Sequence, residues 1–312
     1  MSFFIAFLFS NFPLIKKEDM YQQRFLNFLR FEKRYSNHTI EAYTHELNVF
    51  FTFLQDQGVP EEEADHRVIR LYLSHLMEEG RQATSVNRSI SALRTYYKFL
   101  QRESLTDQNP LTLIKALKTP KKLPSVMEKD KMVGLLDQME GAVDSFTDER
   151  DYLVLELLFG TGIRLTELLQ IKITDIDFYN KNILILGKRN KERLVPVNHT
   201  LLEKLKIYIQ QLDNQKIDNK TAFLIVTKEG KQAYPKMIYR IVHRYLSLIS
   251  TQRKKSPHVL RHTFATALLD NGADLNAIKE LLGHAGLAAT QVYTHNSVER
   301  LKSVYKQAHP KA

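Results

Sequence analysis

The sequence predicts a mainly α-helical protein with one small antiparallel β-sheet, divided into two domains. Its 312 residues are about twice the length of an ordinary domain. Apolar residues recur at helical spacing through residues 21–105, whereas strand-like runs gather in residues 176–197. Residues 106–125, which are rich in proline and lysine, lie between these regions and are expected to be a linker.

The composition narrows the classes of function. The chain has no cysteine, which excludes disulfides, cysteine nucleophiles and thiolate metal sites and suits a reducing cytoplasm. It carries 45 Lys and Arg against 35 Asp and Glu, and the resulting net charge of +10 favours a polyanionic partner.

Residues 1–20 are expected to be an N-terminal extension. Their apolar run, Phe3–Phe9, is far shorter than the roughly 20 residues that cross a bilayer, and it lacks the flanking signals of a secretory leader. No membrane association is therefore expected. The run is either a packing arm or part of an over-extended start, and the amphipathic pattern that begins after Met20 favours the second interpretation.

Residues 21–105 are expected to form a small all-α domain of four helices. Apolar residues repeat every three to four positions in each, and Ser36 can cap the second. The four ranges are Tyr21–Arg34, about Thr39 to Gln55, Val68–Glu79 and Ser85–Leu100.

Residues 126–312 are expected to form a mixed α+β domain. Its strands are expected at Ile176–Phe178, Ile183–Leu186 and Leu194–Val197, with residues 187–193 closing a hairpin between the last two. Glycine, proline and capping signals place helices at Asp151–Phe159, from Arg164, from about Leu201 to Leu212, at Lys236–Ile249, from Pro257 to Asn271 and from Asp274 to Gly283.

Several short motifs could carry chemistry. His258 and Arg261 share a face in the first turn of a helix, where free amides favour an anion. Arg164 follows a glycine-rich turn that fits neither a P-loop nor a dinucleotide fingerprint, and Glu167 lies one turn further on. Alone, each motif is more typical of a solvated turn or a surface ion pair.

Three further features are equally ambiguous when taken singly. Lys188 belongs to a hairpin tip with four basic residues, which is usually a solvated turn. His284 follows a helix C-terminus, where a histidine more often caps or packs. Tyr293 is one of 14 tyrosines, and a lone tyrosine at helical spacing is usually part of the core.

Together, the order and separation of these residues resemble the tyrosine recombinase (phage integrase) family. Thr-Gly-Ile-Arg164-x-x-Glu167 resembles its first box, His258-x-Leu-Arg261-His262 and Leu-Gly-His284 its second, and Tyr293-Thr-His its nucleophile segment. The Gly-Lys-x-Asn-Lys-Glu-Arg hairpin most resembles the Xer branch, which resolves chromosome dimers, although Arg189 stands where Xer relatives commonly have Gly. The likeness covers nearly all of residues 21–308, and it implies a SAM-like core-binding domain followed by the catalytic domain.

The resemblance implies DNA cleavage through a 3′-phosphotyrosyl intermediate. Tyr293 would be the nucleophile and His258 its base, because a phenol needs help to ionise at neutral pH. Arg164, Arg261 and His284 would stabilise the phosphorane, and Lys188 would protonate the leaving 5′-oxygen. Glu167 would hold a neighbouring cation. No metal, ATP or other cofactor is expected, since no matching motif is found.

The resemblance also implies partners. The two domains would close as a C-shaped clamp on a double-stranded recombination site, with a second Xer-type recombinase in a heterotetramer on two sites and a DNA translocase as regulator. Residues Val298–His309 resemble a C-terminal helix that docks on a neighbouring subunit. DNA contacts are expected from Arg88, Ser91, Arg94, Lys98, Arg189 and Lys191, although a solvated polar face explains the first four equally well.

Three alternatives remain open at this point. A mobile-element integrase shares the chemistry, but it often carries an arm-binding domain for which the residues before Tyr21 are too few. A non-catalytic DNA-binding protein would form no covalent adduct. A relaxing topoisomerase would act without a preferred site.

Overall fold

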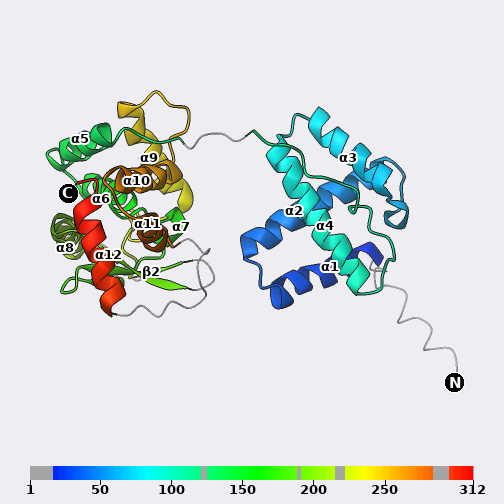
Figure 1. The fold of residues 1–312 in the computed structure, drawn as a ribbon, viewed down its shortest axis with the longest axis horizontal. Coiled ribbons are helices and arrows are strands. Elements are labelled where there is room, and N and C mark those ends of the chain that lie inside the picture. The colour runs from blue at the N-terminus through cyan, green and yellow to red at the C-terminus, as the bar shows by residue number, and fades with distance from the viewer. Residues whose placement is uncertain (1–16, 121–124, 188–190, 215–221, 284–294, 312) are drawn as a thin grey trace, which may run out of the picture. The chain divides into compact units, whose positions relative to one another are not determined.

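The computed structural model describes residues 17–120, 125–187, 191–214, 222–283 and 295–311, with side chains from residue 21 and, in the last range, from residue 299. The chain divides into two compact units, residues 1–122 and 123–312, shown in Figure 1. In the part of the chain that the structure describes, no helix is long and apolar enough to cross a membrane.

In its described residues, the first unit contains helices and no strand, as predicted. Its elements are α1 (Lys17–Asn27), the π-helical turn η1 (Phe28–Glu32), α2 (Asn37–Asp56), the 3-10 turn η2 (Glu61–Glu63), α3 (His66–Glu78) and α4 (Ala83–Arg102). Ser36 accepts a hydrogen bond from the Thr39 amide, so the predicted cap of α2 is confirmed. The apolar faces meet in a core rich in aromatic rings, such as Phe25 packed edge-on against Tyr96 at 5.2 Å.

The first half of the expected linker packs against α4. Leu111 and Ile114 are buried in the core of the first unit. The Asn87 side chain donates to the Leu117 carbonyl at 2.9 Å and accepts from the Leu117 amide at 2.7 Å. Arg94 donates to the Ile114 carbonyl at 2.8 Å. We call residues 106–117 the strap, because these contacts fasten it along the helix.

The second unit is mixed, and the predicted fold class, mainly α with a small antiparallel sheet, is confirmed. Its helices are α5 (Lys129–Glu140), α6 (Phe146–Thr161), α7 (Leu165–Leu168), the 3-10 turn η3 (Ile173–Asp175), α8 (His199–Asn214), α9 (Pro235–Ile249), α10 (Pro257–Asp270), α11 (Leu275–Leu282) and α12 (His295–Ala308). The sequence did not predict α5. Helix α6 is buried on nearly every side and forms the centre of the unit.

The sheet consists of β1 (Ile176–Asp177), β2 (Asn182–Leu186) and β3 (Glu192–Pro196) in the order β1-β2-β3, all antiparallel. The predicted hairpin is confirmed, with Ile183 opposite Val195 and Leu186 opposite Glu192. Alternation along β3 buries Arg193 and Val195 on the same face. An arginine therefore occupies a core position of the sheet.

Helix α12, red in Figure 1, packs on the second unit of its own chain. Leu301, Tyr305 and Ala308 are buried beside residues of α10 and α11, which covers the apolar face of the helix. The Tyr305 hydroxyl donates to the Gly160 carbonyl at 2.9 Å, and the His309 ring lies 3.0 Å from the same oxygen. The sequence predicts docking on a neighbouring subunit for this segment, and this stays a prediction, because the structure holds a single chain.

Candidate active site

Arg164 owes its position to the turn that ends α6. Gly162 has a left-handed backbone with φ of 63°, and a Cβ atom there would lie 2.3 Å from Phe264 Cδ1. Only glycine fits such a position. The chain then turns at once into α7, whose N-cap is Arg164. The glycine-rich turn therefore positions Arg164 at the start of α7 and is not a phosphate-binding loop.

Glu167 is the hub of the site. Its carboxylate, only 3% exposed, accepts four hydrogen bonds: from the Arg164 amide at 2.7 Å, Arg164 Nη1 at 2.7 Å, Arg193 Nη1 at 2.9 Å and Arg193 Nη2 at 2.8 Å. Burial alone would raise the pKa of Glu167, but the ion pair with Arg193 and the bonds from Arg164 outweigh burial and hold the pKa at about 2. The group is an anion at any physiological pH.

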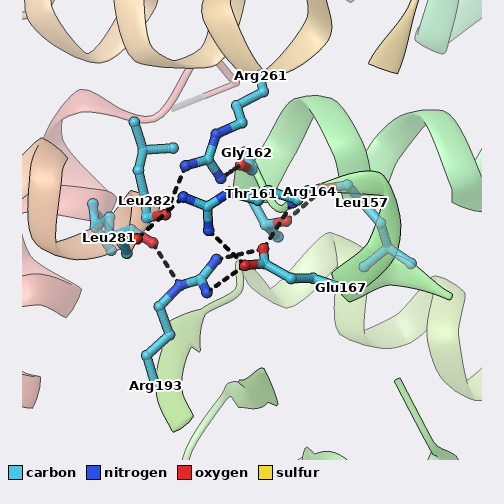
Figure 2. Close-up of polar contacts among 10 residues, drawn as sticks. Leu157, Thr161, Gly162, Arg164, Glu167, Arg193, Arg261, Leu281 and Leu282 are labelled. Carbon is cyan, nitrogen blue, oxygen red and sulfur yellow. Dashed lines mark hydrogen bonds and ion pairs between the residues drawn. The ribbon is translucent and has the colours of Figure 1, made fainter. Parts of the chain in front are cut away.

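Three arginines converge on the C-terminal end of α11, as Figure 2 shows. Arg193 Nε donates to the Leu281 carbonyl at 3.0 Å, Arg261 Nη2 to the Leu282 carbonyl at 2.7 Å, and Arg164 Nη2 to the Gly283 carbonyl at 3.1 Å. The last carbonyls of a helix lack partners within the helix and carry partial negative charge. Each arginine thus caps one of three consecutive carbonyls.

Arg261 is a buried cation. It is 7% exposed, and its Nη1 donates to the Gly162 carbonyl at 2.6 Å. Burial, reinforced by the charge of Arg164, lowers its pKa to about 10. Among the described residues, no carboxylate forms an ion pair with Arg261. Three guanidinium groups and one carboxylate leave the cluster with a charge of 3 − 1 = +2.

The described structure brings together Arg164, Glu167 and Arg261 among the predicted site residues. His258 is exposed in the first turn of α10, one turn before Arg261. Lys188, Arg189, His284 and Tyr293 lie outside the described residues. The two arginines come from elements 97 positions apart in the chain, so their convergence is a property of the fold.

The predicted DNA-contacting residues divide into two groups. Arg88, Ser91 and Lys98 are exposed on α4, and Lys191 is exposed beside β3. Arg94 is partly buried and spends one donor on the strap, at the Ile114 carbonyl. In the described structure Arg94 therefore holds the strap, and its contact with DNA stays a prediction.

Two sets of residues are not predicted by the motifs. Arg193 follows the basic hairpin tip in sequence, but it lies two positions before the apolar Val195 and therefore on the same, buried face of the strand. Helix α9 also presents exposed basic residues at helical spacing. These are Lys236, Arg240, His243 and Arg244. Within the described ranges, the structure places no group of three or more His, Asp or Glu side chains where they could hold a metal ion.

The two units match two parts of one known family. Residues 125–300 match the phage integrase family, and residues 23–104 match its N-terminal SAM-like domain. Tyrosine recombinase XerD of Staphylococcus epidermidis is 36% identical over 292 residues, covering 93% of this chain and 98% of the relative. Tyrosine recombinase XerC of Listeria innocua is 38% identical over 303 residues, covering 95% and 99%.

Solved structures share the fold. The XerH site-specific recombinase, in a post-cleavage complex with a palindromic difH substrate, superimposes with a TM-score of 0.70 at 23% identity, covering 90% of this chain and 83% of that one. A lambda integrase dimer bound to a core site gives a TM-score of 0.65 at 18% identity, covering 88% and 98%. The site-specific recombinase predicted from the motifs is confirmed, and the chain belongs to the phage integrase family, in its Xer branch of tyrosine recombinases.

Proposed function

We propose that this recombinase cuts and rejoins double-stranded DNA through Tyr293. The phenolic oxygen attacks the phosphorus, a 3′-phosphotyrosyl bond forms and the 5′-oxygen leaves as a hydroxyl. A 5′-hydroxyl from the partner strand then attacks the same phosphorus and releases the tyrosine. His258 accepts the phenolic proton, and Lys188 protonates the leaving oxygen. Each strand is resealed without loss of bond energy.

One observation carries this proposal: the guanidinium groups of Arg164 and Arg261 belong to a cluster that, with Arg193 and Glu167, has a net charge of +2. A phosphodiester carries one negative charge, and its pentacoordinate transition state carries about one more on the non-bridging oxygens. The cluster therefore matches the transition state more closely than the ground state. That difference is the condition for catalysis by charge. His284, next in sequence to Gly283, supplies a further donor.

The exposed basic residues of both units supply contacts to the DNA backbone. On α4 these are Arg88 and Lys98, and on α9 they include Arg240 and Arg244. Such contacts release counterions, so affinity falls steeply with salt.

The biological role we propose is the resolution of chromosome dimers to monomers in the cytoplasm. A second Xer-type recombinase would complete a heterotetramer on two sites, under the control of a DNA translocase. Similarity to both a XerC and a XerD protein along nearly the whole chain supports this role.

The decisive experiment is adduct formation on a nicked suicide substrate. We expect wild type to become covalently attached to DNA and Tyr293→Phe to bind DNA without an adduct. Tyr179→Phe is the matched control, because Tyr179 is 92% exposed in the same unit and should keep the adduct. An adduct that still forms in Tyr293→Phe would show that Tyr293 is not the nucleophile.

Sequencing the DNA trapped on purified protein tests the biological role. One chromosomal site supports dimer resolution, whereas the ends of a mobile element would make the protein an integrase. Trapping without any preferred site would indicate a topoisomerase. Cells that lack the activity should accumulate chromosome dimers, and a normal monomer fraction would contradict the proposed role.

A further inference from the structure

We propose that Arg193 is a positioning residue for DNA cleavage, and that it acts by seating the β2–β3 hairpin, which carries Lys188, on the Glu167 hub. The inference rests on the proposed function, in which Lys188 protonates the leaving oxygen. Nothing in the motif pattern assigns a role to Arg193. Its contacts point to one, because they reach the backbone directly before two of the proposed catalytic residues.

The first of these contacts is at Gly187, the residue before Lys188. The Gly187 amide donates to the Lys191 carbonyl at 2.7 Å and so closes the base of the hairpin. A Cβ atom on Gly187 would lie 3.4 Å from Arg193 Nη1 and 3.5 Å from Glu167 Oε1. The Arg193–Glu167 ion pair therefore lies where a side chain at position 187 would begin.

The second contact is at Gly283, the residue before His284. A Cβ atom there would lie 3.1 Å from Arg193 Nη1 and 3.2 Å from both Cδ and Cζ. Gly283 is also left-handed, with φ of 64°, and ends α11. The guanidinium thus lies against two glycines, and each glycine directly precedes a proposed catalytic residue.

Only an arginine side chain can bind Glu167 and the end of α11 at the same time. Arg193 uses Nε for the Leu281 carbonyl and both Nη atoms for Glu167, in a planar two-pronged pair. Because the residue belongs to β3, opposite Ile185 of β2, the side chain fixes the hairpin and not only the helix end. Lysine would keep the charge but could not form the planar pair and the carbonyl contact together.

One carboxylate, Glu167, therefore positions two different parts of the site. Glu167 holds Arg164 on one side and Arg193 on the other, so the phosphate-binding arginine and the base of the Lys188 hairpin share one reference point. Loosening Arg193 should release the hairpin more than it releases Arg164, since Arg164 also binds Glu167 through its backbone amide and binds the Gly283 carbonyl. The proton transfer to the leaving oxygen should suffer most.

The test compares two DNA substrates in the full-length protein. One has the natural 5′-bridging oxygen, and the other has a 5′-bridging sulfur, whose departure needs no proton. We expect Arg193→Lys to form adduct at least about tenfold more slowly on the oxygen substrate, since general acid catalysis contributes roughly 10²–10⁴-fold. The sulfur substrate should recover most of that loss, as it should in Lys188→Ala. DNA affinity should stay within about twofold of wild type.

Arg150→Lys is the matched control for the loss of a buried ion pair. Arg150 binds Asp151 at 2.8 Å, and its side chain is 8% exposed. It lies in the first half of α6, about 18 Å from the Gly162 end by helical rise. Arg150→Lys should lower both substrates' rates equally, through the folded fraction alone.

Gly187→Ala tests the same contact without removing a charge. Its Cβ would lie 3.2 Å from the Lys191 carbonyl oxygen and would crowd the ion pair, so the sulfur-to-oxygen rate ratio should rise here also. If Arg193→Lys fails to fold, Gly187→Ala decides the question alone. A wild-type ratio in the folded variants overturns the role of Arg193. A wild-type protein that forms no adduct on either substrate instead overturns the proposed function.

Discussion

Replacing Glu167 by glutamine should destabilise the catalytic unit in a way that depends on pH. The carboxylate accepts four hydrogen bonds, three of them from guanidinium groups. A glutamine has nearly the same shape, but it offers one acceptor oxygen and turns an NH₂ group toward an arginine. The charge of the cluster would rise from +2 to +3 with no new partner.

The magnitude follows from the pKa of Glu167. Lowering that pKa from 4.5 to about 2 corresponds to about 3 kcal/mol of stability at neutral pH. Because the folded-state pKa is depressed, the contribution is complete well above pH 4.5 and is lost as the pH falls toward 2. About 2 kcal/mol of the difference between wild type and Glu167→Gln should therefore disappear between pH 7 and pH 3.

Urea unfolding followed by circular dichroism, at a series of pH values, measures this difference. Glu149→Gln is the matched control, because Glu149 is a buried carboxylate of the same unit whose pKa is raised by burial. A raised pKa has the opposite effect on stability, because the ionised form of Glu149 destabilises the folded state above pH 4.5. Glu149→Gln should therefore be at least as stable as wild type at pH 7 and should lose any advantage in acid.

A Glu167→Gln protein as stable as wild type at pH 7 would refute the reasoning. So would a stability difference that stays constant from pH 7 to pH 3, because the loss would then be one of packing and not of charge.

Three further predictions concern the anion site, the turn and the DNA contacts. Sulfate at 100 times its Kd should stabilise the wild-type protein by about 2.7 kcal/mol, seen as a higher melting temperature. The rise should be much smaller in Arg261→Gln, and equal rises in both proteins would exclude an anion site at Arg261. Gly162→Ala should unfold or severely destabilise the catalytic unit, since its Cβ would overlap Phe264; a melting temperature within a few degrees of wild type would contradict the assigned backbone. Arg240→Ala should reduce the slope of log affinity against log salt by about 1, and an unchanged slope would remove α9 from the DNA interface.

Periodicity and caps predicted most of the fold. The helices α2, α3 and α4 begin and end within about two residues of their predicted limits, because turns, N-caps and glycine stops are local signals. Helix α5 was missed, since its apolar residues are few and a glycine, Gly134, interrupts the pattern. The packing of the strap on α4 was also beyond sequence reasoning, because side chain to backbone bonds such as Asn87 to Leu117 leave no periodic trace.

The site was predictable as a set of residues but not as an arrangement. The motifs named Arg164, Glu167 and Arg261, and the structure brings these three together. They could not show that the arginines bind the end of α11, since such contacts join residues 20 to 120 positions apart. Arg193 was not predicted for a related reason. A charged residue beside a basic turn is usually exposed, and only the alternation of buried residues along β3 indicates that this one is buried.

The buried charge of Arg261 lowers the stability of the free protein. Holding that cation in a buried site, with its pKa lowered to about 10, costs the free protein about 3 kcal/mol. Selection for heat resistance alone would therefore favour neutral replacements at this position. If Arg261 binds the DNA phosphate as proposed, such replacements would make the protein more stable but unable to cleave DNA, and bound phosphate would offset the cost of the buried charge.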